Sequence, residues 1–226
     1  AMAVVYVRGV QSQGVAATIK HFIGNECEHE RRTTSSEIDE KTLREIYFPP
    51  FEAAVKEAGV ACVMTAYNAL NGVHTSENPW LLDTILRREW GFDGVVMSDW
   101  TATHSTVAAL LAGLDLEMPG PGKFRGERLV EAVENGEVPR EAVRHAARRV
   151  MRLIERVGAK TTDDLETERA EDRPETRALI RRAGAEAAVL LKNDGGLLPL
   201  ADPTPRRIAV IGPNAAGKSS LFKRIA

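Results

Sequence analysis

Four short strand-like segments alternate with helical patterns through the first 157 residues of this 226-residue chain. Three of them, residues 15–19, 60–64 and 94–97, are apolar, and the fourth, residues 114–117, alternates leucine with acidic residues. Short apolar runs separated by helices are typical of parallel strands, because each parallel strand needs a crossover connection to the next. The alternation therefore predicts an α/β fold with a parallel sheet. Four such units are about half of an eight-unit (β/α)8 barrel of the TIM type.

The segments between these runs carry the signals that begin and end helices. Asn78-Pro79 supplies a capping side chain followed by proline at the first helical position, and Gly91 ends the helix that follows. Pro49-Pro50 is expected to interrupt a helix that begins near Glu40, because proline removes a backbone donor and clashes with the preceding turn. Helical patterns also cover residues 4–10, 51–58, 125–135 and 139–157.

The sequence becomes polar and acidic after residue 157 and then regains an apolar pattern. Residues 158–175 include two adjacent acidic pairs and almost no apolar period, which predicts a linker. Residues 176–226 begin with a helical pattern that continues to Leu191, and a short apolar strand is predicted over 208–211. We therefore expect a first domain over residues 1–157, a linker over 158–175 and the beginning of a second domain over 176–226.

Charge and cysteine content exclude several classes of protein. The 30 basic and 32 acidic residues give a net charge of −2, so composition favours neither nucleic acid nor a membrane surface as a partner. No apolar run approaches the roughly 20 residues that span a bilayer. Cys27 and Cys62 are too few for a disulfide framework or a zinc site, so we expect unpaired thiols and neither metal nor cofactor. Unpaired thiols, and a beginning at Ala1 without the regions of a secretory signal, favour a cytoplasmic protein.

Polar side chains stand where three of the predicted strands end. These are Lys20-His21, Tyr67-Asn68 and Asp99-Trp100. Because the carboxyl ends of parallel strands meet at one rim, we expect these groups to converge. Charged and neutral hydrogen-bonding groups suit sugar hydroxyls, and an indole suits the apolar face of a pyranose ring. A carboxylate at such a site can attack an anomeric carbon or stabilise an oxocarbenium ion.

Each of these residues also has a purely structural interpretation. Asp99 is well placed to cap a helix that begins near Thr101, since aspartate is a common cap residue. A lysine–histidine pair at a strand end is commonly solvated or salt-bridged, and Tyr67 by itself fits a core position. The convergence of the residues at one rim, rather than any one of them, favours a sugar site.

Longer motifs surround these strand ends. They are Lys20-His21-Phe22, Asn25-Glu26-x-Glu28-His29-x-Arg31, Leu43-Arg44-Glu45-Ile46-Tyr47 with Pro50-Phe51, Met64-Thr65-Ala66-Tyr67-Asn68 with Asn71-Gly72, and Gly91-Phe92-x-Gly94-Val95-Val96-Met97-Ser98-Asp99-Trp100. Together they closely resemble the β-glucosidase branch of the family-three glycoside hydrolases. Three later motifs look like the opening of that family's second domain: Val189-Leu190-Leu191-Lys192-Asn193, Leu197-Leu198-Pro199-Leu200 and Ile211-Gly212-Pro213-Asn214-Ala215. The resemblance implies the second half of a (β/α)8 barrel, followed by the first elements of an α/β sandwich domain.

The resemblance also implies a reaction. It implies a retaining enzyme that releases terminal β-linked glucose or a similar sugar from an oligosaccharide or aryl glycoside, with Asp99 as the nucleophile. It implies roles at the subsite of that sugar for Lys20, His21, Arg31, Tyr67 and Trp100. A related N-acetylglucosaminidase branch has Pro-Gly-His where this chain has Ile23-Gly24-Asn25, which disfavours an N-acetyl substrate.

A retaining mechanism needs a second carboxyl group roughly 5–5.5 Å from the first. In this branch of the family that group comes from a part of the second domain that lies beyond residue 226. The first half of the barrel is expected to be missing as well. We therefore expect a fragment with little or no glycosidase activity by itself, to be completed by the missing segments or in an oligomer.

The end of the chain suggests an alternative function in nucleotide binding. Residues 212–219 fit the phosphate-loop pattern G-x-x-x-x-G-K-[ST] after a predicted strand. In that interpretation Gly217 lets backbone amides approach the phosphates, Lys218 contacts the terminal phosphates and Ser219 binds magnesium. However, the motif begins within the Ile-Gly-Pro-Asn-Ala of the glycosidase resemblance, and no second acidic magnesium-binding strand accompanies it. The glycosidase interpretation is therefore favoured.

Overall fold

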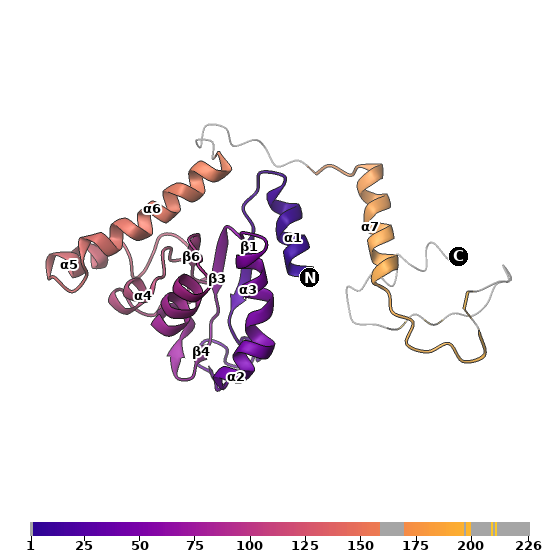
Figure 1. The fold of residues 1–226 in the computed structure, drawn as a ribbon, viewed down its shortest axis with the longest axis horizontal. Coiled ribbons are helices and arrows are strands. Elements are labelled where there is room, and N and C mark those ends of the chain that lie inside the picture. The colour runs from indigo at the N-terminus through magenta and orange to yellow at the C-terminus, as the bar shows by residue number, and fades with distance from the viewer. Residues whose placement is uncertain (1, 159–169, 197, 200–208, 210, 212–226) are drawn as a thin grey trace. The chain divides into compact units, whose positions relative to one another are not determined.

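A computed structural model describes residues 2–158, 170–196, 198–199, 209 and 211 of the chain. The chain divides into two compact units, residues 1–165 and residues 166–226. The strands and nearly all of the helices that the structure describes belong to the first unit (Figure 1).

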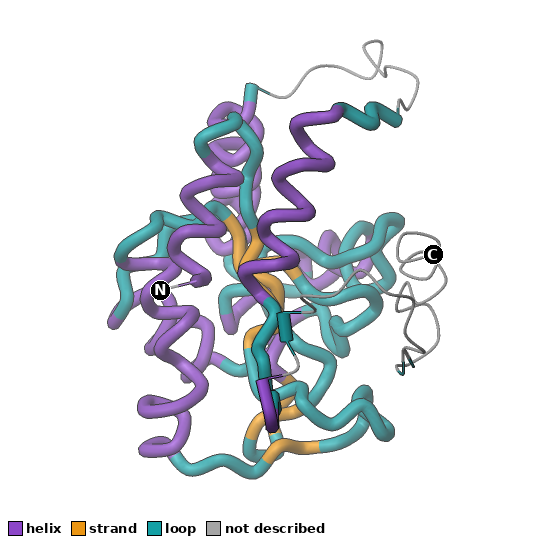
Figure 2. Tube along the Cα trace, turned by 90° about the vertical axis from the view of Figure 1, so that its right-hand side faces the viewer, coloured by secondary structure: helices purple, strands orange, loops and turns teal. Residues whose placement is uncertain are grey.

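A three-stranded parallel sheet forms the centre of the first unit. Its strands are β1 (Thr18–Phe22), β3 (Cys62–Thr65) and β6 (Val95–Met97), in the order β1-β3-β6. Cys62 pairs with both Thr18 and Val95, and Met97 forms a parallel bridge with Leu116, where the fourth strand was expected. The tube view shows these strands inside the unit with helices around them (Figure 2). The prediction of an α/β fold with parallel strands is confirmed.

The first strand lies three residues later than the sequence predicts. The apolar run 15–19 begins at Val15, which is 56% exposed and precedes the strand. The strand instead ends at Phe22, which has no exposed surface and packs against the rings of Phe51 and Trp90. Because Phe22 is buried at the end of the strand, the two polar residues that precede it also become part of the sheet. Lys20 and His21 therefore lie within β1 rather than after it.

The helical segment around Pro49-Pro50 is continuous, contrary to the expected interruption. It passes from α2 (Glu40–Thr42) through the π-helical η1 (Leu43–Tyr47) into α3 (Phe48–Lys56). The two prolines occupy the first turn of α3, where a missing N–H and the fixed backbone angle are tolerated. The change of helix type at η1 thus accommodates the prolines without ending the helix.

The remaining helices of the first unit largely follow the predicted segments. They are α1 (Met2–Gln11), the π-helical η3 (Trp80–Glu89), α4 (Val107–Ala112), α5 (Glu127–Glu134) and α6 (Arg140–Val157). The Asn78 side chain accepts a hydrogen bond from the Leu81 N–H at 3.0 Å, which confirms the predicted cap before η3. A second small sheet contains β2 (Ser35–Ser36), β4 (Ala69–Leu70) and β5 (Val73–His74), and the short helix η2 (Thr75–Glu77) follows it.

Apolar residues cover both faces of the central sheet. Val63 and Val96 face the main core, to which α3 and η3 contribute. Residues of the opposite parity, Cys62 and Val95, form a separate cluster with Val150 of α6 and its neighbours. In a TIM-type barrel each helix lies in the outer ring. Here α6 instead contacts the face opposite to α3 and η3, so the described residues form a sheet with helices on both faces.

The second unit is described only in part. It contains α7 (Pro174–Ala187) and the short helix η5 (Asp194–Gly196). The helix expected to reach Leu191 ends at Ala187, and the chain from Ala188 to Leu191 is exposed and not helical. The strand expected over 208–211 and the phosphate-loop residues 212–219 lie largely or wholly outside the described residues.

Among the described residues no helix is long and apolar enough to cross a membrane, and no group of three or more metal-ligating side chains is present. Cys27 is exposed and Cys62 is buried, and both are free thiols.

Candidate active site

Asp99 lies two residues after β6, at the carboxyl end of the parallel strands. The neighbouring Ser98 holds this end of the strand in place, since its N–H donates to the Leu116 carbonyl at 2.9 Å and its hydroxyl accepts from the Met118 N–H at 2.9 Å. The Asp99 side chain is only 8% exposed. Its Oδ1 accepts a hydrogen bond from the Trp100 N–H at 2.7 Å, and Oδ2 remains without a hydrogen-bond partner among the described residues.

The interpretation of Asp99 as a helix cap is wrong. The next helix, α4, begins at Val107, and its N-cap residue is Thr106. A cap side chain accepts hydrogen bonds from the first turn of its own helix. The Asp99 carboxylate is too far along the chain from α4 to do so. Its buried position therefore needs another explanation, which its side-chain neighbours supply.

His21 of β1 is the first of these neighbours. Its Nε2 lies 3.1 Å from Oδ2 of Asp99, although the two residues are 78 positions apart in the chain. Burial lowers the pKa of His21 below its usual 6.5; the Asp99 carboxylate opposes this shift, whereas the charges of Lys20 and Arg31 add to it. The imidazole is thus held neutral beside an acidic residue, where it can donate or accept one hydrogen bond.

Tyr67 and Arg31 form the next part of the site. The Arg31 guanidinium lies 4.4 Å from the centre of the Tyr67 ring and pairs with Glu28 at 2.6 Å. Burial raises the pKa of Tyr67, and the nearby Asp99 carboxylate raises it further. The phenol therefore faces the carboxylate as a protonated group. Tyr67 is also buried, so it contributes to packing and to the site at once.

Lys20 and Trp100 are not brought into contact with this group by any interaction among the described residues. Lys20 is exposed and lines a hollow of about 450 Å³ together with His21, Asn25 and Glu26. Trp100 follows Asp99 directly, but its side chain projects into solvent and is 57% exposed. The structure thus assembles His21, Arg31 and Tyr67 around Asp99 and leaves Lys20 and Trp100 at the edge.

The short helix η2 connects two strand-end loops and was not predicted from the sequence. The Thr75 hydroxyl accepts from the Ala66 N–H at 3.0 Å and donates to the Ala66 carbonyl at 2.8 Å, beside Tyr67. The Ser76 hydroxyl donates to the Ala102 carbonyl at 2.7 Å. Both hydroxyl residues are fully buried. They tie the loop after β3 to the loop after β6.

Two histidines next to these bonds stack on each other. The rings of His74 and His104 are 3.6 Å apart and 14° from parallel. Burial and the neighbouring His74 ring lower the pKa of His104. Since the Ala102 N–H donates to the Asp99 carbonyl at 3.0 Å, the stacked pair and η2 support the chain that follows Asp99.

Glu117 organises the remaining loop at this rim. Its buried carboxylate accepts four hydrogen bonds from the backbone N–H groups of Lys123, Phe124 and Arg125, at 2.9 to 3.2 Å. A Cβ at Gly122 would meet the carboxylate at 2.7 Å, so glycine is needed there. The sequence predicts Glu117 only as the last residue of the strand expected over 114–117, and no local pattern reveals its role in the loop that follows.

The contribution of Thr75 can be tested with a matched pair of variants. We expect Thr75→Val to lower the free energy of unfolding by about 1–3 kcal/mol, because the buried Ala66 carbonyl loses its donor. Thr75→Ser retains the hydroxyl and should lose clearly less. Urea denaturation of both variants measures the difference. Equal losses would mean that the threonine methyl group, rather than the hydroxyl, is what stabilises the loop.

A carboxylate beside a neutral imidazole, a guanidinium and a phenol can bind hydroxyl groups and stabilise or attack an electrophilic carbon between them. The fold and this rim have the features of a glycoside hydrolase. Comparison with known families agrees: residues 1–153 match the family described as "Glycosyl hydrolase family 3 N terminal domain". The chain belongs to glycosyl hydrolase family 3, and the resemblance inferred from the motifs is confirmed.

Individual relatives are β-glucosidases. A beta-glucosidase of Rhizobium radiobacter is 66% identical over 217 residues, which cover 96% of this chain and 26% of the relative. A probable beta-glucosidase I of Neosartorya fischeri is 48% identical over 210 residues, covering 93% and 25%. The chain thus spans about a quarter of the length of the curated relatives it matches.

Solved structures of relatives share the fold. Beta-glucosidase 3B from Thermotoga neapolitana, in complex with α-D-glucose, is 40% identical with a TM-score of 0.81, over 89% of this chain and 29% of that one. The GH3 beta-glucosidase of Bifidobacterium adolescentis is 42% identical with a TM-score of 0.79, over 88% and 29%. These comparisons give no support to the alternative of nucleotide binding through Gly217, Lys218 and Ser219.

Proposed function

We propose that this chain carries the nucleophile and part of the sugar subsite of a retaining β-glucosidase. The observation that carries the proposal is the buried Asp99 carboxylate at the strand end, with His21 Nε2 at 3.1 Å and one oxygen free of hydrogen bonds within the described part of the chain. A nucleophile needs a lone pair that no hydrogen bond occupies, and Oδ2 keeps one, although the atom itself is buried beside His21. The β-glucosidase names of the relatives, and the glucose bound by the Thermotoga neapolitana enzyme, support the same substrate class.

The neighbouring side chains have complementary roles in this proposal. His21 and Arg31 hold hydroxyls of the terminal glucose, and Tyr67 donates its proton toward Asp99 or the sugar. Lys20 reaches the sugar from the hollow beside β1, and the exposed Trp100 covers the apolar face of the pyranose ring. Neither side chain is held by other residues described here, so substrate is the partner that would order them.

The arrangement of domains is part of the same proposal. Residues 1–157 would supply the C-terminal half of a TIM-type barrel in the whole enzyme, although in the described residues α6 covers the second face of the sheet. Residues 158–175 form a linker and 176–226 the start of an α/β sandwich domain. In this proposal the acid that protonates the leaving group comes from another part of the whole enzyme, as the family resemblance implies. The 226-residue chain alone is then a poor catalyst.

The expected result with the purified chain is little or no release of the aryl group from an unactivated aryl β-glucoside. A general acid commonly contributes a factor of about 10²–10⁴ to the rate, so its absence removes most turnover. A chromogenic assay at neutral pH measures it. Sustained hydrolysis that disappears in Asp99→Ala would show that the chain needs no acid from other parts of the enzyme. The same result would support Asp99 as the nucleophile.

The lowered pKa of His21 predicts a pH effect on stability. At pH values near and below the usual histidine pKa of 6.5, His21 binds a proton more readily in the unfolded state than in the folded state. The free energy of unfolding therefore rises with pH in this range and falls as the pH is lowered. Urea midpoints measured between about pH 5 and 7.5 should therefore increase with pH. His21→Asn should flatten this slope, and His104→Asn should remove a separate part of it, because the pKa of His104 is lowered too.

The pKa of His21 also tests whether its side chain contacts Asp99. Asp99 is the largest influence that raises the pKa of His21, so Asp99→Asn should lower the pKa further. An NMR titration of the imidazole measures the shift. An unchanged or raised pKa in this variant would show that the two side chains are not in contact in solution.

A further inference from the structure

Helix α6 concentrates positive charge in a chain whose formal net charge is −2. It carries six arginines and two glutamates. The arginines are Arg140, Arg144, Arg148, Arg149, Arg152 and Arg156. Like charges four residues apart on a helix destabilise it. Several of these arginines are four residues apart, so their mutual repulsion destabilises the helix. A ligand that binds the arginines would explain why they are present.

Four arginines line one concave groove beside α6. The groove has a volume of about 440 Å³ and lies between this helix and the turn after η3. Its charged and polar lining consists of Arg87, Arg148, Arg149, Arg152, His145 and Asp93. A smaller adjoining hollow of about 120 Å³ shares Arg149 and Arg152 and adds Arg156. Asp93 is the one carboxylate in this lining, so the groove carries a clear excess of positive charge.

Two of these arginines are held in place by a buried carboxylate. Asp115, whose side chain is 1% exposed, lies 2.6 Å from an Arg87 nitrogen and 2.9 Å from an Arg149 nitrogen. Arg87 also donates to the carbonyls of Phe92 and Gly94 at 3.1 and 2.6 Å. These contacts fix the inner wall of the groove before any ligand arrives, which reduces the entropy lost on binding.

The other two arginines remain available. Arg148 and Arg152 are exposed and take part in no ion pair within the described part of the chain, and they lie one helical turn apart on the same side of α6. Guanidinium groups bind phosphate oxygens through paired hydrogen bonds. Since Asp93 and Asp115 balance the charges of Arg87 and Arg149, the two free guanidinium groups leave an excess of two positive charges, which matches a phosphate dianion better than a single carboxylate.

The size of the groove indicates more than a phosphate ion. Small-molecule sites typically measure about 300–1,000 Å³, and this groove is in that range. Gly91 and Phe92 supply uncharged lining next to the arginines. An inorganic phosphate would leave most of this space to water, whereas a phosphate ester can fill it with its organic part.

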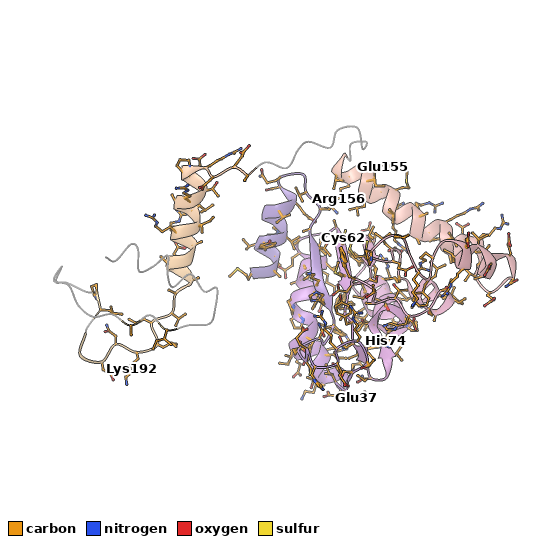
Figure 3. All side chains as sticks on the ribbon, turned by 180° about the vertical axis from the view of Figure 1, so that it is seen from behind. Glu37, Cys62, His74, Glu155, Arg156 and Lys192 are labelled. Carbon is orange, nitrogen blue, oxygen red and sulfur yellow. The ribbon has the colours of Figure 1, made fainter. Side chains whose placement is uncertain are left out.

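We propose that the groove between α6 and the Gly91–Gly94 turn binds a small organic phosphate, held by Arg148 and Arg152. The site is separate from the candidate active site. Figure 3 shows Arg156, which lines the adjoining hollow, near Cys62 at one end of the first unit, whereas His74, beside the loop that follows Asp99, lies toward the other end. The proposal does not depend on glycosidase activity.

Isothermal titration calorimetry of the full 226-residue chain tests the proposal with three probes. We expect glucose 6-phosphate to bind saturably at one site and at least tenfold more tightly than inorganic phosphate. Unphosphorylated glucose should produce no heat that depends on Arg148 or Arg152. No saturable binding of glucose 6-phosphate, or equal affinity for inorganic phosphate, would contradict the assignment to an organic phosphate.

A matched pair of double variants distinguishes specific binding in the groove from a general effect of the positive charge of α6. Arg148→Gln with Arg152→Gln should weaken glucose 6-phosphate binding at least tenfold. Arg140→Gln with Arg144→Gln removes the same charge from the same helix outside the groove, and should change affinity less than twofold. Equal weakening in both double variants would overturn the proposal. Far-ultraviolet circular dichroism and urea midpoints establish that both variants remain folded.

Discussion

An Asp115→Ala variant is expected to lose about 3–5 kcal/mol of unfolding free energy, because it leaves a buried arginine without its counter-charge. The Asp115 carboxylate is 1% exposed and Arg87 is 9% exposed, so water cannot replace the lost partner without opening the structure. Asp115 also accepts a hydrogen bond from the Val96 N–H at 2.9 Å, inside β6. One substitution therefore loosens η3, α6 and the strand that leads to Asp99.

An exposed ion pair provides the control for this measurement. Asp83 pairs with Arg88 on the surface of η3, where solvent screens the interaction. Asp83→Ala should change the unfolding free energy by no more than about 1 kcal/mol. Urea denaturation at pH 7 compares the two variants directly. If Asp115→Ala cost no more than Asp83→Ala, the buried cluster would not be holding the unit together.

The order of the elements could be predicted from the sequence because it depends on local patterns. The apolar runs at β3 and β6 and the cap at Asn78 each carry their signal within a few residues. The prediction failed at β1, where burial of Phe22 draws two polar residues into the strand. A tertiary contact overrides the local apolar pattern there.

The position of α6 could not be predicted for a different reason. Its amphipathic pattern indicates which side of the helix is buried, but not which face of the sheet receives it. The contact of Val150 and Leu153 with the Cys62 and Val95 face is a long-range choice. The role of Asp115 could not be predicted either, because an acidic residue in a predicted strand does not reveal two arginines 28 and 34 positions away.

The candidate site likewise contains residues that the sequence predicts and residues that it does not. Asp99 and His21 were predicted to converge because both stand near the carboxyl ends of parallel strands, and the structure brings them to 3.1 Å. The hydroxyls of Thr75 and Ser76 left no comparable signal, because a single buried hydroxyl has no periodic pattern in sequence. Such supporting bonds become visible only when their backbone partners are placed.

An activated fluoroglucoside is expected to label Asp99 covalently and to leave an Asp99→Asn variant unlabelled. In 2,4-dinitrophenyl 2-deoxy-2-fluoro-β-glucoside, the phenolate departs without being protonated, so this step needs a nucleophile but no general acid. A carboxylate oxygen of Asp99 bonds to the anomeric carbon as the bond to the phenolate breaks, and the fluorine slows hydrolysis of the ester. Intact-mass and peptide mass spectrometry should find one fluoroglucosyl group, located on the peptide that contains Asp99.

A second carboxylate distinguishes this reaction from unspecific esterification. Asp93 is exposed and precedes β6, whereas Asp99 is buried and follows it, so the two stand at opposite ends of the same strand. Asp93→Asn should be labelled as fast as the unaltered chain, and Asp99→Asn at least about 100-fold more slowly. Labelling on Asp93, or equal rates in the two variants, would remove Asp99 from its proposed role. Because the reagent needs no general acid, the result tests the nucleophile even in a chain that does not turn over an ordinary glucoside.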